Sequence, residues 1–153
     1  QTRGTLTLLG TVESVPPESH LERRVVQGPI TAARLAARAE APPTEAKRRM
    51  SAADIQITPD GRFLYTTERT SSKLALFTVD TPTGQLHYIE NISTATQPRG
   101  IRIDPRGTFL VASGEKSNVV IVYRINRETG RLSEVGRYPG GEGANWVEIV
   151  DLP

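Results

Sequence analysis

Apolar and polar positions follow the same order in two stretches of the chain that lie a fixed distance apart. The matched positions keep a constant offset of 46 (103 − 57): Ile57 with Ile103, Gly61 with Gly107, Phe63 with Phe109, and Leu86 with Leu132. The register holds without a gap from the first matched pair to the last. Chance matches do not keep register over a whole unit, so the pattern indicates an internal repeat.

Each repeat unit divides into four short strands. The first unit places them at residues 53–57, 63–68, 74–80 and 86–93, and the second at residues 100–104, 109–114, 119–125 and 132–138. Turn signals separate them, with PDG or PRG after the first strand and TPTG or RETG before the fourth. The third strand is so apolar that we expect it to be buried on both faces. The pattern predicts an all-β fold, a β-propeller of four-stranded antiparallel blades.

The two ends of the chain carry parts of further blades. Residues 1–17 match the outer strand of a unit, residues 51–97 and 98–143 are two full blades, and residues 144–153 match the inner strand of a ring-closing blade. Both terminal strands lack a partner in the chain, and propellers close with about four to eight blades. We therefore expect the remaining blades to come from a longer chain or from another chain.

Residues 18–50 interrupt the repeat. They contain seven Lys and Arg against four acidic residues, a net charge of +3. The run ITAARLAARAE is rich in helix formers and is followed by Pro42 and Pro43, which predicts a short helix. We interpret the segment as a basic, partly helical insertion, either a solvated surface loop or a docking surface for a partner.

The composition narrows the possible functions. An apolar fraction of 37% is typical of a folded globular protein, and 19 basic residues interleaved with 17 acidic ones give no basic stripe for nucleic acid. No apolar run approaches the roughly 20 residues that cross a membrane. Two histidines and no cysteines leave no zinc-type ligand set, so we expect no metal. The sequence also has no P-loop or dinucleotide glycine pattern, and we expect no cofactor. The lack of cysteines also fits a reducing compartment, and we expect a cytoplasmic location.

Since the chain starts with Gln1, a segment before it could have been removed, or the sequence could be one piece of something longer.

Several motifs in the repeats resemble those of a known family. These are Asp54, the triplet Glu68-Arg69-Thr70, the triplet Gln97-Pro98-Arg99, and Trp146 near the end of the chain. They look like the C-terminal part of the lactonase-type seven-bladed propellers, over residues 51–150 clearly and over residues 1–16 more weakly. The resemblance implies hydrolysis of a sugar-acid lactone, such as 6-phosphogluconolactone in the pentose phosphate pathway. It also implies that the last strand completes a blade begun at the N-terminus of the full protein, and that this chain alone is inactive.

The candidate site lies at one end of the blades. The loop that enters each inner strand and the link between the second and third strands reach the same face, where loops from several blades converge. We expect Arg69 and Arg99 to be catalytic, orienting an anionic lactone and stabilising the oxyanion that forms when water attacks its carbonyl. The residues expected to bind the substrate are Asp54, Arg69, Arg99, Lys116 and Trp146.

Each candidate residue also has a structural interpretation. Asp54 could cap backbone amides at the entry of an inner strand, Glu115 and Lys116 could be a solvated link, and Trp146 could pack a joint between blades. Arg99 matches Ala53, so the repeat does not demand an arginine there. At the level of function, two alternatives stay open: a non-catalytic propeller that serves as an interaction module, and a carboxymuconate-type lactonising enzyme that uses the same arginines.

Overall fold

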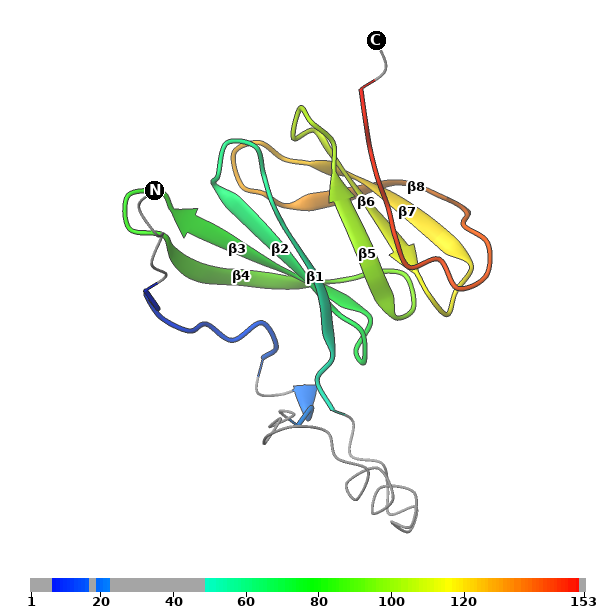
Figure 1. Cartoon of the computed structure of the whole chain (residues 1–153), viewed down its shortest axis with the longest axis horizontal. Helices are drawn as coiled ribbons and strands as arrows, with labels where there is room; N and C mark the ends of the chain where they lie inside the picture. Colours follow the sequence, from blue (N-terminus) through cyan, green and yellow to red (C-terminus); the bar gives the residue numbers. More distant parts are fainter. Residues whose placement is uncertain (1–6, 17–18, 23–48, 152–153) are drawn as a thin grey trace, which may run out of the picture.

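The computed structural model describes residues 7–16, 19–22 and 49–151. Within them the chain forms two four-stranded antiparallel sheets, in the strand orders β1-β2-β3-β4 and β5-β6-β7-β8 (Figure 1). The first sheet contains β1 (Ala52–Ile57), β2 (Phe63–Glu68), β3 (Lys73–Asp80) and β4 (Gln85–Ser93). The second contains β5 (Pro98–Ile103), β6 (Phe109–Gly114), β7 (Val119–Ile125) and β8 (Leu132–Pro139). Each sheet is an up-and-down meander, which confirms the predicted propeller blades.

The repeat extends to strand register and irregularities. Tyr65 pairs with Leu76 across β2 and β3, and the residues 46 positions later, Val111 and Val122, pair across β6 and β7. The bulge between β3 and β4 follows Leu76, and the bulge between β7 and β8 follows Val122. A bulge increases the local twist of a strand. Both blades are therefore twisted at the same place.

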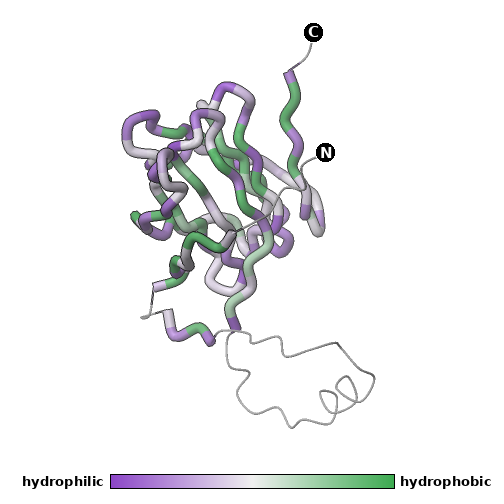
Figure 2. The backbone as a smooth tube through the Cα atoms, turned by 60° about the vertical axis from the view of Figure 1, so that its left-hand side comes forward, coloured by the Kyte–Doolittle hydropathy of each residue, from purple (hydrophilic) through white to green (hydrophobic). Residues whose placement is uncertain are grey.

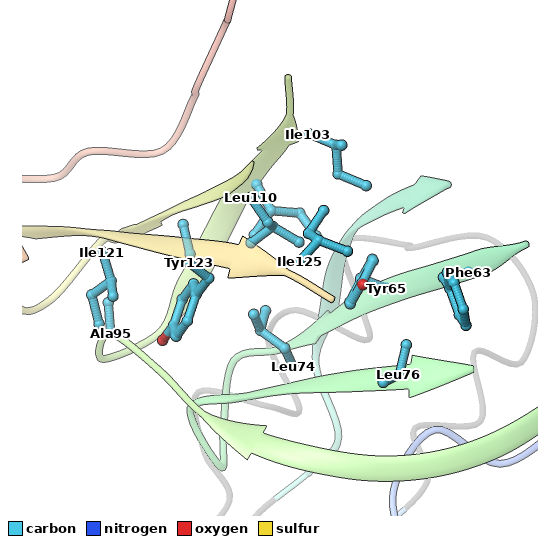
Figure 3. Close-up of a cluster of buried hydrophobic side chains, with 12 residues drawn as sticks. Phe63, Tyr65, Leu74, Leu76, Ala95, Ile103, Leu110, Ile121, Tyr123 and Ile125 are labelled. Atoms are coloured by element: carbon cyan, nitrogen blue, oxygen red, sulfur yellow. The ribbon is translucent and has the colours of Figure 1, made fainter. Parts of the chain in front are cut away.

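The core lies between the two sheets. Phe63, Tyr65 and Leu74 of the first blade meet Leu110 and Ile125 of the second in one cluster of buried side chains (Figure 3). The Tyr65 hydroxyl donates a hydrogen bond of 2.5 Å to the carbonyl oxygen of Gly130, in the turn between β7 and β8. Figure 2 shows hydrophobic positions along the strands and hydrophilic positions in the connecting turns. Apolar packing and this buried hydrogen bond thus join the two blades.

Equivalent residues of the two blades differ in exposure. Ile55 on β1 is 59% exposed, whereas Ile101, its equivalent on β5, is 1% exposed. Ile57 and Ile103 show the same contrast. The difference arises because the first blade covers β5, and nothing in the described residues covers the matching face of β1. On β3, Leu74 through Phe77 are all buried, which confirms the expected burial on both faces there. On β7 the expectation is wrong, because Ile121, Tyr123 and Ile125 are buried but the residues between them are partly buried or, at Arg124, exposed.

The ends of the chain lie outside the sheets. Residues 144–151 form no strand, but they run beside β5, where the backbone of Asn145 approaches Gly100 and Glu148 pairs with Arg102 at 2.8 Å. Residues 9–12 lie against the start of β4 and likewise form no strand. The outer and inner strands expected at these ends stay predictions. The helix expected in the insertion lies outside the described residues. Glu22 and Arg49, on either side of the undescribed part, form an isolated β-bridge.

Candidate functional site

The candidate site is built by equivalent links in neighbouring blades. Arg69 follows the last residue of β2, and Glu115, which is 46 residues later, follows the last residue of β6. The backbone NH of Arg69 donates to the Ser51 carbonyl at 2.8 Å, and that of Glu115 donates to the Gln97 carbonyl at 3.2 Å. Each link is therefore tied to the loop that enters the inner strand of its own blade. This places both side chains at the same end of the sheets.

Glu115 connects two arginines. Its Oε2 accepts a hydrogen bond from Nη2 of Arg69, and Nη1 of Arg99 lies 3.6 Å from the same oxygen. Arg69 and Glu115 are mostly buried, with side chains 25% and 21% exposed, and Arg99 is half-exposed. A carboxylate with such partners forms a stronger ion pair than one on the open surface. The two guanidinium groups that the sequence predicted to be catalytic are thus brought together on one oxygen.

The electrostatics of this cluster keep Glu115 ionised. Partial burial opposes ionisation, but the hydrogen bond from Arg69 and the positive charges of Arg69, Arg99 and Lys116 outweigh it. The pKa of the Glu115 carboxyl is therefore lowered below its ordinary value. Three cations, Arg69, Arg99 and Lys116, therefore act on the one carboxylate of Glu115. Such a group of cations attracts an anion.

One donor of the cluster is not used. The Nε atom of Arg69 is buried and has no hydrogen-bond partner among the described residues. An unpaired buried donor costs on the order of 1–3 kcal/mol, which is regained when an acceptor arrives. Because Nε is enclosed by protein, a ligand oxygen could reach it only if the Arg69 side chain moved.

Asp54 forms hydrogen bonds within the fold, whereas the side chain of Trp146 is mostly exposed. The Asp54 carboxylate accepts hydrogen bonds from the backbone NH groups of Ile55 at 2.8 Å and Ile101 at 2.9 Å, so it ties β1 to β5. The backbone of Trp146 passes close to Gly100, beside Arg99, and its side chain is 75% exposed. Asp54 thus has the capping contacts that the alternative interpretation expected. Its substrate-binding role, and that of Trp146, stay predictions.

Glu68 has a different role from Glu115. Its buried carboxylate accepts backbone hydrogen bonds from Ser51 at 2.8 Å, from Thr70 at 3.1 Å and from Ser71. This carboxylate holds the link after β2 in shape. Glu115 was interpreted from the sequence mainly as a solvated link residue, and the structure instead places it at the centre of the cluster. The signal that could have identified it is the opposite charge of Arg69 at the matching repeat position.

Among the residues that the structure describes, no group of three or more metal-ligating side chains could hold a metal ion. In the same part of the chain, no helix is long and apolar enough to cross a membrane.

Comparison with known proteins identifies the family. The model of the seven-bladed β-propeller lactonases matches residues 3–149. The chain belongs to this family. The 6-phosphogluconolactonase of Yersinia pestis is 48% identical over 98 residues, which are 64% of this chain and 29% of that protein. The chain thus spans less than a third of the length of its curated relatives.

Solved structures agree with the family assignment. A protein from Lactobacillus plantarum superposes with a TM-score of 0.64 at 28% identity, over 71% of this chain and 32% of that one. The periplasmic gluconolactonase of Pseudomonas aeruginosa gives a TM-score of 0.59 at 26% identity, over 67% of this chain and 29% of that one. The two blades of this lactonase-family chain are therefore arranged as neighbouring blades of such rings.

Proposed function

We propose that this chain is the part of a 6-phosphogluconolactonase that supplies two substrate-orienting arginines. The observation that carries the proposal is the convergence of Arg69 and Arg99, from neighbouring blades, on one oxygen of Glu115. Relatives at 48% identity that are named 6-phosphogluconolactonase support the choice of reaction. A cluster with two guanidinium groups suits the phosphate and the ring oxygens of the lactone.

The reaction is addition of water to the lactone carbonyl and cleavage of the ring ester bond. One guanidinium binds an anionic or oxygen-rich part of the substrate, and the other donates to the oxyanion of the tetrahedral intermediate. Glu115 holds both guanidinium groups and acts as a positioning residue. Because its pKa is lowered, it is a weak base, and the group that accepts the proton from water is assigned to one of the other blades.

The proposed activity requires the complete ring. A site at the mouth of a propeller channel uses loops from several blades, and the reacting groups must be held in position together. We therefore expect hydrolysis of 6-phosphogluconolactone by the complete propeller and none by these two blades alone.

The test is the rate of 6-phosphogluconolactone hydrolysis by the complete propeller and its Arg99→Gln variant. Loss of one oxyanion donor lowers kcat by about 10²–10³-fold. The control is Arg131→Gln, which removes the same charge from a residue whose side chain is mostly exposed and pairs with Glu90 at 3.8 Å. Equal activity of the two variants would refute the proposed role of Arg99.

A carboxymuconate-type lactonising activity is the second candidate. The observation that favours it is that two guanidinium groups from different blades match the two carboxylates of a dicarboxylate. A substrate panel that contains both lactones decides between the reactions. If the complete propeller acts on neither, the non-catalytic interaction module becomes the better proposal.

The cellular location is part of the same proposal. A role in the pentose phosphate pathway places the protein in the cytoplasm, where phosphorylated sugars are made. The gluconolactonase of Pseudomonas aeruginosa, to which this chain is similar, is periplasmic. Cell fractionation with an antibody against the protein distinguishes the two locations.

A further inference from the structure

A second basic site lies at the opposite end of the blades. The turns between β1 and β2, β5 and β6, and β7 and β8 meet there, since antiparallel strands put these turns away from the Arg69 link. They surround a cavity of about 240 Å³. Three arginines line it, namely Arg62, Arg106 and Arg127, together with Asp60. The side chains that line the cavity therefore carry a net charge of +2 (3 − 1), and the cavity is separate from the candidate site.

Two of these arginines are fixed in place. Arg62 donates through Nε to Asp60 at 2.9 Å and through Nη2 to the Arg127 carbonyl at 2.6 Å, and its guanidinium lies 5.3 Å from the centre of the Phe63 ring. Arg127 donates through Nη2 to the Arg106 carbonyl at 3.4 Å and to Thr108 at 3.2 Å. Side chains that are already ordered lose less entropy when a ligand binds.

The third arginine is free to bind. Within the described residues, the Arg106 guanidinium has no hydrogen bond or ion pair, although its backbone NH donates to Asp104 at 3.3 Å. Arg106 lies in the turn that contacts the first blade through Gly107 and Pro59. Its donors can therefore turn toward a ligand held between the blades.

The repeat does not require arginine at these positions. The residues that match Arg62, Arg106 and Arg127 in the other blade are Thr108, Asp60 and Thr81. A turn of this kind thus forms with a threonine or an aspartate in place of each arginine. Only the joint between these two blades brings the three guanidinium groups together.

We propose that this cavity binds a small phosphate-bearing metabolite, such as a diphosphate or a phosphate ester. A phosphate ester carries a charge of roughly −1.5 to −2 at neutral pH, which matches the net charge of the side chains that line the cavity. Guanidinium groups bind phosphate oxygens in pairs, and three of them from three turns can surround one group. The volume is below the roughly 300–1,000 Å³ of sites for larger organic ligands, in keeping with a compact ligand.

The test is calorimetric titration of the full chain with inorganic pyrophosphate at low and at physiological ionic strength. We expect saturable binding, weakened about tenfold in Arg106→Gln and in Arg127→Gln. Arg137→Gln, which removes the same charge from β8, should bind as the unaltered chain does, and Arg99→Gln reports any pyrophosphate that binds at the Arg69 and Arg99 cluster instead. The backbone amide signal of Gly107 should shift on titration in NMR spectra, and that of Gly100 should not.

Three results would overturn the proposal. The first is the absence of saturable binding by the unaltered chain. The second is an equal loss in Arg137→Gln and Arg106→Gln, which would mean a general attraction of anions to a basic protein. The third is loss of binding in Arg99→Gln alone, which would assign the pyrophosphate to the Arg69 and Arg99 cluster.

Discussion

The turn between the first two strands of each blade is stabilised by different side chains in the two blades. In the second blade, Oδ1 of Asp104 accepts the backbone NH groups of Thr108 and Phe109, both at 2.6 Å. In the first blade the matching residue is Thr58, whose hydroxyl accepts from the Phe63 NH at 3.1 Å and donates to Asp60 at 2.6 Å. A carboxylate in one blade is thus replaced by a hydroxyl and a carboxylate in the other. The turn therefore depends on its hydrogen bonds rather than on one residue type.

This difference makes the first turn sensitive to acid. The hydrogen bond from Thr58 and those from Arg62 stabilise the charged form and lower the pKa of Asp60 from 3.8 to about 2. A lowered pKa contributes stability that is fully present above the unfolded value and is lost as the pH falls through the folded value. Asp60→Asn should therefore lower Tm at pH 7, and its difference from the unaltered chain should shrink between pH 4 and pH 2. Melting curves across this range measure it, and a constant difference would contradict the prediction.

Glu115 gives a second pH-dependent prediction. Since its pKa is lowered, its ion pairs with Arg69 and Arg99 persist at neutral pH and are lost only when the pH falls below the ordinary glutamate range. Glu115→Gln should lower kcat of the complete propeller about 10-fold or more, because the two guanidinium groups lose their shared anchor. The part of the acid decline of kcat/KM that falls below the ordinary glutamate range should disappear in the variant, while any decline caused by the proton-accepting group of another blade should remain. An unchanged pH profile would show that Glu115 does not position the arginines.

At the scale of elements, the joint between blades depends on a glycine. Gly130 has a φ of +71°, and a Cβ atom there would lie 2.4 Å from the nearest Phe63 ring carbon. The Phe63 ring therefore packs directly on the turn between β7 and β8. Tyr65 donates to the carbonyl of the same glycine, so one turn receives both contacts from the first blade.

Gly130→Ala should destabilise the protein more than a matched glycine substitution. The control is Gly61→Ala, since Gly61 has a φ of +74° and no atom within 4 Å of the added Cβ. Both variants carry the left-handed backbone cost of about 1–2 kcal/mol. Gly130→Ala should add about 1–3 kcal/mol for overpacking against Phe63. Urea unfolding measures both, and equal free energies of unfolding would show that the joint adjusts freely.

The elements are the part of the structure that the sequence predicts best. The bounds of β2, β6 and β7 are those expected from the repeat, because turn residues and apolar runs mark both their ends. Arg69 and Arg99 were expected on one face, and they lie there. The role of Glu115 was not predicted, because a carboxylate in a polar link has the same local pattern whether it meets water or an arginine of the next blade. Such contacts depend on how neighbouring blades pack, and the sequence of one repeat unit does not show which residues of the next blade it meets.

At the scale of the whole molecule, the face of β1 that points away from β5 is exposed. Ile55 and Ile57 are exposed, while the residues that match them on β5 are buried by a neighbouring blade. Membership of a seven-bladed family implies that a blade of the complete ring covers β1 as the first blade covers β5. The stability of this part of the chain should then depend on that blade.

Substitution of the two equivalent isoleucines tests this dependence. In the isolated chain, Ile55→Asp should change the free energy of unfolding by less than about 1 kcal/mol, and Ile101→Asp should cost about 3–5 kcal/mol. In the complete propeller, both substitutions should have the larger cost. Chemical denaturation of the four variants measures this, and a small effect of Ile55→Asp in the complete ring would mean that no blade covers β1.

The pairing of Arg69 with Glu115 limits the symmetry of the ring. The two residues occupy the same position in consecutive repeats, so at this joint a positive side chain meets a negative one. If every joint followed this rule, the charges would have to alternate around the ring. Alternation can close only around an even number of blades, and the family has seven. At least one joint of the ring must therefore lack this pairing of opposite charges. If the ring arose by copying one unit, the copies must have diverged at the position of Arg69 and Glu115.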